Sequence, residues 1–106
     1  MTLGQSAVVN DLAALPLHDA TLLNLAVDWK ERVCTAEIRG ALARNATSAR
    51  LRWADMTHLE VPLQRPWGPS VSILEARGPL HGHYEIRMQS GDVISIAAGA
   101  CTLEVA

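Results

Sequence analysis

The sequence predicts an all-β fold, or a β-rich α+β fold, built as an antiparallel sandwich or partly open barrel. Three observations lead to this prediction. Apolar and polar residues alternate with a period of two through most of the chain after residue 16. Turn-forming residues interrupt the alternation about every 8–12 residues, which gives roughly seven to eight short strands. The chain has 106 residues, of which 49% are hydrophobic, so residues 1–106 form a single β-rich domain with enough apolar side chains for a core.

One short N-terminal helix is predicted over residues 5–15. Apolar residues recur there at helical spacing, Ser6 is a candidate N-cap, and Pro16 closes the segment. The rest of the chain is predicted to form strands. These cover residues 23–29, 33–39, 50–53, 57–61, 71–76, 84–89, 93–96 and 101–105.

Large and sulfur-containing side chains on these strands suggest where the core lies. Trp29 and Trp53 fall on inward phases, so both are expected to be buried. Cys34 and Cys101 each lie in an alternating apolar segment and are predicted to be reduced core thiols.

Charge and hydropathy argue against two classes of partner. The formal net charge is -2, and the nine basic residues form no run, which predicts no nucleic-acid partner, although Arg44, Arg50 and Arg52 could gather into a local patch. No apolar run approaches the ~20 residues that a membrane span needs. The chain begins without a basic start and a continuous apolar stretch, so a cytoplasmic location is predicted.

Histidines are the main candidates for chemistry. His18 and Asp19 form a candidate polar site, because a carboxylate beside an imidazole can orient a general base. No nucleophile, metalloprotease or phosphate-loop motif accompanies them, so a structural role and no enzymatic activity are predicted. His81 and His83 could hold a metal together with Asp55 or His58. No further ligand stands at a recognised spacing, so neither metal nor cofactor is predicted.

The segment Arg65-Pro66-Trp67-Gly68-Pro69-Ser70 is predicted to be a stiff loop, because its prolines fix φ and remove backbone donors. Trp67 either plugs one end of the sheets or serves as an anchor for a partner. The candidate partner-binding residues are Trp67, Ser70 and Arg65. Three carboxylates on outward phases of separate strands could form an acidic face: Glu60, Glu75 and Glu85.

Three segments together resemble small bacterial proteins of the immunity protein 50 type. They are Leu17-His18-Asp19-Ala20, Pro66-Trp67-Gly68-Pro69-Ser70 and Met88-Gln89-Ser90-Gly91-Asp92, and the resemblance spans roughly residues 17 to 97. It implies a mostly β protein that neutralises a bacterial toxin by binding it, with no catalytic residues.

Three functional hypotheses follow. The first is a non-catalytic protein-binding module, in its most specific form an immunity protein whose partner is a cognate toxin. The second is a small-ligand or metal-binding β domain. The third, compatible with both, is a homodimer formed through exposed strand edges, since no edge-blocking proline is evident near the C-terminal end.

Overall fold

The computed structural model describes residues 5–40, 48–62 and 72–105, which form an all-β fold with one short 3-10 helix, η1. The elements are β1 (Gln5–Val8), η1 (Leu12–Ala14), β2 (Thr21–Asp28), β3 (Val33–Arg39), β4 (Ser48–Ala54), β5 (His58–Glu60), β6 (Ile73–Leu80), β7 (His83–Met88), β8 (Val93–Ala97) and β9 (Ala100–Val105). The predicted all-β fold is confirmed. The described residues contain nine strands, one more than the upper end of the prediction.

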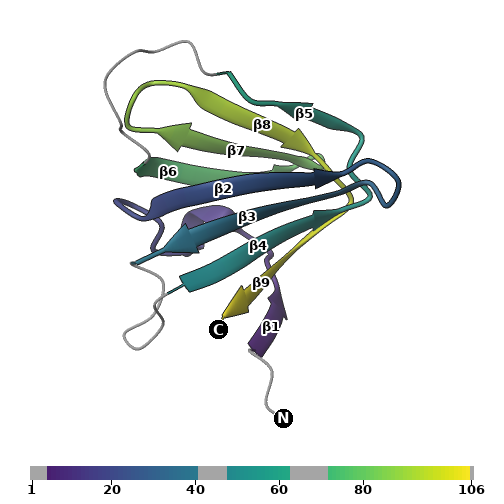
Figure 1. Cartoon of the computed structure of the whole chain (residues 1–106), viewed down its shortest axis with the longest axis horizontal. Coiled ribbons are helices and arrows are strands. Elements are labelled where there is room, and N and C mark those ends of the chain that lie inside the picture. The colour runs from purple at the N-terminus through teal and green to yellow at the C-terminus, as the bar shows by residue number, and fades with distance from the viewer. Residues whose placement is uncertain (1–4, 41–47, 63–71, 106) are drawn as a thin grey trace.

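The strands form two antiparallel sheets (Figure 1). One has the order β1-β9-β4-β3-β2 and the other the order β5-β8-β7-β6. At one end of the molecule the chain passes twice between the sheets, from β4 into β5 and from β8 into β9, and the two crossing segments stay paired. A single bridge between Thr21 and Ser72 connects the outer strands β2 and β6. The two sheets therefore enclose one core as a partly open barrel.

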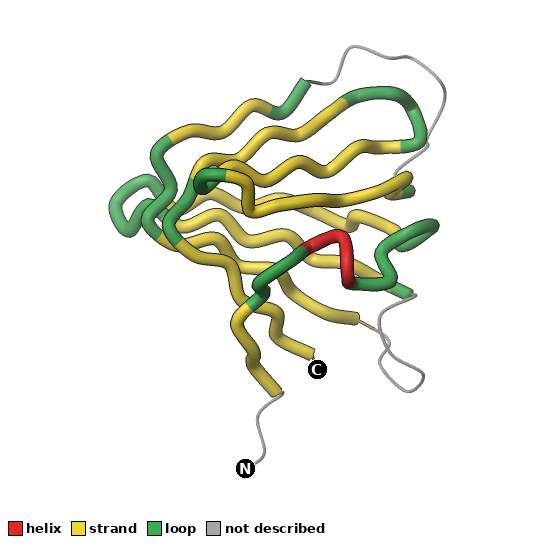
Figure 2. The backbone as a smooth tube through the Cα atoms, turned by 180° about the vertical axis from the view of Figure 1, so that it is seen from behind, coloured by secondary structure: helices red, strands yellow, loops and turns green. Residues whose placement is uncertain are grey.

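The predicted helix over residues 5–15 is wrong, because residues 5–8 form β1 and pair with β9. Only Leu12–Ala14 is helical, and the side chain of Asp11 caps this turn by accepting a hydrogen bond from the Ala13 backbone N–H at 3.0 Å. Leu12 is fully buried. The apolar residues that suggested one helical face thus belong to two elements, β1 and η1. The 3-10 helix η1 is drawn in red in Figure 2, on the side of the molecule that faces the viewer.

Trp53 lies at the centre of the core, with 0% of its surface exposed. In the first sheet it stands opposite Cys34 on β3 and Cys101 on β9. From the second sheet, Tyr84 meets it edge to face, with ring centroids 6.2 Å apart and an interplanar angle of 71°. Aromatic pairs favour this geometry. The predicted burial of Trp53 is confirmed.

The predicted burial of Trp29 is wrong, because 82% of its surface is exposed. A bulge between Leu22 and Asn24 shifts the phase of β2, so that Leu25 and Val27 still pack against the core while Leu23 faces outward. The strand then ends at Asp28, one residue before Trp29. The alternation that seemed to point the indole inward does not extend to it.

Cys34 and Cys101 are buried free thiols, as the sequence predicts. Strand β4 lies between them, which places their Cα atoms about two strand spacings, roughly 9.6 Å, apart. Disulfides need Cα atoms within about 7 Å. Burial raises the pKa of the Cys34 thiol to about 11 and that of Cys101 to about 12. Both side chains therefore act as small apolar core residues.

The two tryptophans should differ sharply in their effect on stability. Trp53→Ala should lower the free energy of unfolding by about 3–5 kcal/mol, because it removes a buried ring and leaves a cavity. Trp29→Ala should change it by no more than about 0.5 kcal/mol, as at other exposed sites. Urea denaturation of the two variants measures both values, and equal losses would contradict this assignment of core and surface.

The thiols make stability depend on alkaline pH. Their folded pKa values lie above the ordinary value of 9.0, so the folded state favours the neutral thiol. This contribution is complete below pH 9.0 and is lost as the pH rises toward about 11 and 12. Urea denaturation between pH 8 and 10.5 should show a steeper fall in the parent than in the Cys34→Ala/Cys101→Ala double variant. Parallel profiles would contradict the prediction.

Candidate functional site

The predicted partner-binding residues Arg65, Trp67 and Ser70 lie outside the described residues. The chain is described again from Ser72 onward, at the point where β6 begins. Ser72 forms the bridge to Thr21, and its carbonyl accepts a hydrogen bond from the Gln89 backbone N–H at 2.9 Å. The two other motifs identified in the sequence lie around His18 and around Gln89. They meet beside Ser72, which follows the motif over residues 66–70 in the chain.

The predicted polar site, His18 and Asp19, forms part of this contact, which we call the β2–β6 seam (His18, Asp19, Thr21, Ser72 and Gln89). His18 Nδ1 lies 2.8 Å from the Leu74 carbonyl oxygen, so Nδ1–H donates to it. His18 Nε2 lies 3.5 Å from the Asp19 carboxylate. The Gln89 amide donates to the other carboxylate oxygen of Asp19.

Backbone hydrogen bonds complete the seam. Asp19 N–H donates to the Ile73 carbonyl and Ile73 N–H donates to the Ala20 carbonyl, each at 2.8 Å. Asp19 has a φ of 67°, a left-handed conformation that Asp tolerates better than most residues. Both His18 and Asp19 side chains are mostly exposed, and their polar atoms are occupied by neighbours. These contacts tie β2 to β6, which is a structural role.

The four histidines do not gather. His81 lies in the β6–β7 turn with a φ of 52°. His58 and His83 stand opposite Ala97 from either side, so a whole strand separates them. His58 Nε2 lies 2.9 Å from the Glu60 carboxylate. Within residues 5–40, 48–62 and 72–105, no three histidine, cysteine or carboxylate side chains are placed to hold a metal ion.

Glu60, Glu75 and Glu85, which could have formed an acidic face, each have a basic neighbour. Glu85 Oε1 accepts a hydrogen bond from Arg77 Nε at 2.7 Å, a contact that raises the pKa of the Arg77 guanidinium. Glu60 pairs with His58, and Glu75 stands opposite Arg87. The outer surface of this sheet therefore has mixed charge. A shallow space of about 410 Å³ lies at its β6–β7 end beside Leu80 and His83.

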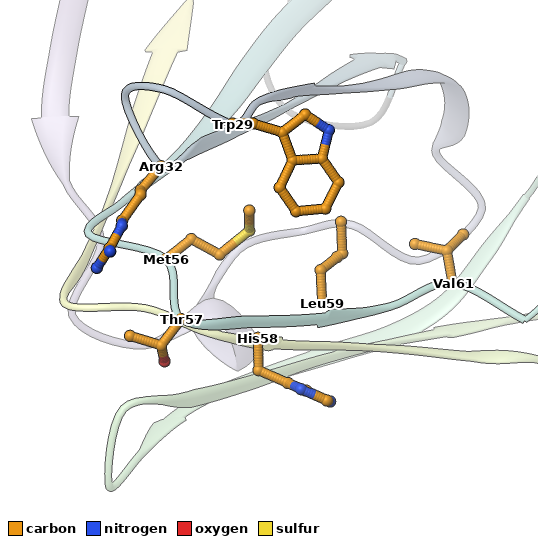
Figure 3. Close-up of a pocket in the computed structure, with 7 residues that line it drawn as sticks. All are labelled: Trp29, Arg32, Met56, Thr57, His58, Leu59 and Val61. Atoms are coloured by element: carbon orange, nitrogen blue, oxygen red, sulfur yellow. The ribbon is translucent and has the colours of Figure 1, made fainter.

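The most distinctive feature of the described surface is a hollow beside Trp29, with a volume of about 660 Å³ (Figure 3). We call it the Trp29 hollow. It is lined by Trp29, Arg32, Met56, Thr57, His58, Leu59 and Val61. The side chains of Trp29, Met56 and Leu59 point toward one another, whereas His58 points away. The lining is mainly apolar and includes no carboxylate among the described residues.

The β2–β3 turn holds Trp29 over this hollow. The Asp28 carboxylate accepts a hydrogen bond from the Glu31 backbone N–H at 3.0 Å, and Arg32 takes a φ of 57° to enter β3. The Arg32 carbonyl then accepts a hydrogen bond from Met56 N–H at 2.9 Å, which ties the turn to the segment between β4 and β5. The indole is thus presented to solvent from a turn anchored at both ends.

Sequence reasoning missed this site because its residues come from two segments far apart in the chain, the β2–β3 turn and the stretch from Met56 to Val61. One signal was present. Trp29 is the last residue of the predicted strand over residues 23–29, and the loop that follows a strand runs over the protein surface.

Comparison with known proteins yields a fold and no function. The chain matches no protein-family profile, and no curated protein matches it. A solved structure of an uncharacterised protein from Neisseria gonorrhoeae is similar, with a TM-score of 0.58 and 10% sequence identity, over 93% of this chain and 96% of the other. At this identity the similarity shows the fold alone. No helix in the described residues is long and apolar enough to cross a membrane.

Gln89 should contribute measurably to the seam. Gln89→Ala removes the side-chain bonds to Asp19 and to the Ile73 carbonyl, so the free energy of unfolding should fall by about 0.5–1.5 kcal/mol. Asn24→Ala is a suitable control, because Asn24 is an exposed polar residue on β2 without a side-chain hydrogen bond in the described part of the chain. Denaturant titration compares them. Equal effects would show that the seam does not depend on this side chain.

Proposed function

We propose that this chain is a non-catalytic protein-binding module that binds its partner through the Trp29 hollow. The observation that carries the proposal is the 82% exposure of Trp29 above an apolar depression. Burial of a large apolar ring on binding releases water and contributes strongly to affinity, which is why tryptophan is enriched among the residues that dominate interfaces.

The anchored turn supports this proposal. An anchor already held in place loses little conformational freedom on binding, so more of its contact energy appears as affinity. The hydrogen bonds at Asp28 and at Met56 supply this rigidity at both ends of the turn. A standard interface buries about 800 Å² per partner, and the total surface of 6819 Å² leaves room for one around the hollow.

The lining also suggests what the partner presents. Among the described lining residues, His58 points away and bonds to Glu60, and the Thr57 hydroxyl donates to the Ala97 carbonyl, so the Arg32 guanidinium is the donor offered to a partner. A partner that inserts an apolar side chain and places a carboxylate beside Arg32 would satisfy both parts of the surface. In its most specific form, the partner is a bacterial toxin, as the resemblance to immunity proteins of type 50 implies.

The motifs behind that resemblance have a different part in this proposal. The described residues of two of them build the β2–β6 seam, so they support the fold and leave contact with the partner to the opposite end of β2. A related protein could then keep these motifs and change its partner by changing the residues around the hollow.

Trp29→Ala should weaken partner binding by about 2 kcal/mol or more, which is roughly 30-fold in Kd, because it removes the anchor while the fold is kept. Leu80→Ala is the matched control: Leu80 is also a large apolar residue, 71% exposed, but lies at the β6–β7 end. Light scattering and calorimetry would measure binding to the product of any toxin-like gene found adjacent to the gene for this chain.

Loss of binding in Trp29→Ala with parent-like binding in Leu80→Ala supports the hollow as the contact surface. Equal binding by the two variants would reject the hollow, while binding itself would still support the module. A purified toxin product that forms no complex with the parent would reject the immunity assignment.

A further inference from the structure

The two sheets have four outer strands, and three of them carry features that prevent further pairing. Strands β2 and β6 are joined to each other by the Thr21–Ser72 bridge, and both have irregular register. Strand β5 has three residues, two of them charged or titratable, and Pro62 follows two residues after its end. Bulges, charges, short length and prolines are the means by which natural sheets block their edges.

Strand β1 is also short, at four residues, but it has no bulge, no charge and no proline. Its residues are Gln5, Ser6, Ala7 and Val8, without charge or proline, and they pair with β9 in unbroken register. The first charged residue of the sequence is Asp11. The extended pairing continues one residue further, because Val9 N–H donates to the Cys101 carbonyl at 2.8 Å. The opposite edge of β1 has no neighbour among the described residues.

We propose that β1 is a self-association edge through which two copies of this chain pair as antiparallel strands. A twofold axis at Ala7 places Ala7 opposite Ala7 of the second copy, and Val8 opposite Ser6 of the second copy. This register keeps the outer faces of both sheets on the same side, as continuous pairing requires. It also covers Val8, whose surface is 67% exposed in one copy.

Charge does not oppose this pairing. Glu104 on β9 is the nearest charged residue in the same cross-strand row as Ser6. Arg50 on β4 and Glu37 on β3 continue this row, and the Arg50 guanidinium lies 3.6 Å from the Glu37 carboxylate. The two Glu104 side chains of a dimer would be separated by about three strand spacings, roughly 14 Å, beyond the ~8–10 Å over which salt leaves charges interacting strongly. An uncharged strand meeting its own copy has no like charges in direct opposition.

The contact is small, so the dimer should be weak. One pair of short strands buries less than the roughly 1,200 Å² of a standard interface, and such contacts form transient complexes. We therefore expect a concentration-dependent equilibrium with a Kd in the micromolar to millimolar range. In Figure 1, β1 lies at the bottom of the molecule and β5, beside the Trp29 hollow, at the top, so each copy would keep its hollow free.

Sedimentation equilibrium over about 10 μM to 1 mM tests the proposal on the complete chain. The parent should shift from its monomer mass of 11.4 kDa toward twice that value. Val8→Lys adds a charge at the edge and should keep the protein monomeric. Leu23→Lys, at an exposed apolar position on the blocked strand β2, should dimerise like the parent. Near-ultraviolet circular dichroism checks that both variants are folded.

A second measurement tests the register without relying on Val8→Lys. Ala7→Cys should form an intermolecular disulfide on mild oxidation, because directly opposite Cα atoms lie about 4.5–5.5 Å apart. Leu80→Cys, far from β1, should not. A parent that remains monomeric at 1 mM, a dimer that survives Val8→Lys, or equal cross-linking of the two cysteine variants would each overturn the proposal.

Discussion

The fold depends on the contact between Trp53 and Tyr84, where the two sheets meet. Trp53 stands between two small side chains, Cys34 and Cys101, on the neighbouring strands, and its ring meets that of Tyr84 from β7 in an edge-to-face arrangement. Interiors pack at crystal-like density, so a large ring between two small neighbours fixes the spacing of the sheets. The indole N–H has no partner among the described groups, so its burial rests on packing.

The seam and the hollow lie at opposite ends of β2. At its beginning, the strand is bound to β6 by the Thr21–Ser72 bridge and by Asp19. At its end, the turn is bound to Met56. Attachment at both ends of the strand restricts the backbone of the turn that carries Trp29. In the function proposed above, the His18 and Gln89 motifs would act on binding only indirectly, through the placement of β2.

Much of the fold was predictable because alternation reports directly which face of a strand is buried. The burial of Trp53 and the reduced thiols followed from it. The errors occurred where tertiary structure decided the outcome. Residues 5–8 have a pattern that suits a helix, but they form a strand because their backbone pairs with the edge of β9. A bulge in β2 and the end of that strand put Trp29 outside. The hollow joins segments that only the complete fold brings together, so no local pattern could reveal it.

Trp53 packs at the centre of the core, whereas we propose that the exposed Trp29 is presented to a partner. Hydrogen exchange of the indole N–H groups, followed by NMR with Trp29→Phe and Trp53→Phe for assignment, tests it most directly. The Trp29 indole proton should exchange at the rate of an unstructured peptide, whereas the Trp53 proton should persist until the protein unfolds. Protection of Trp29 equal to that of Trp53 would contradict the proposed division of roles, because Trp29 would then be part of the core.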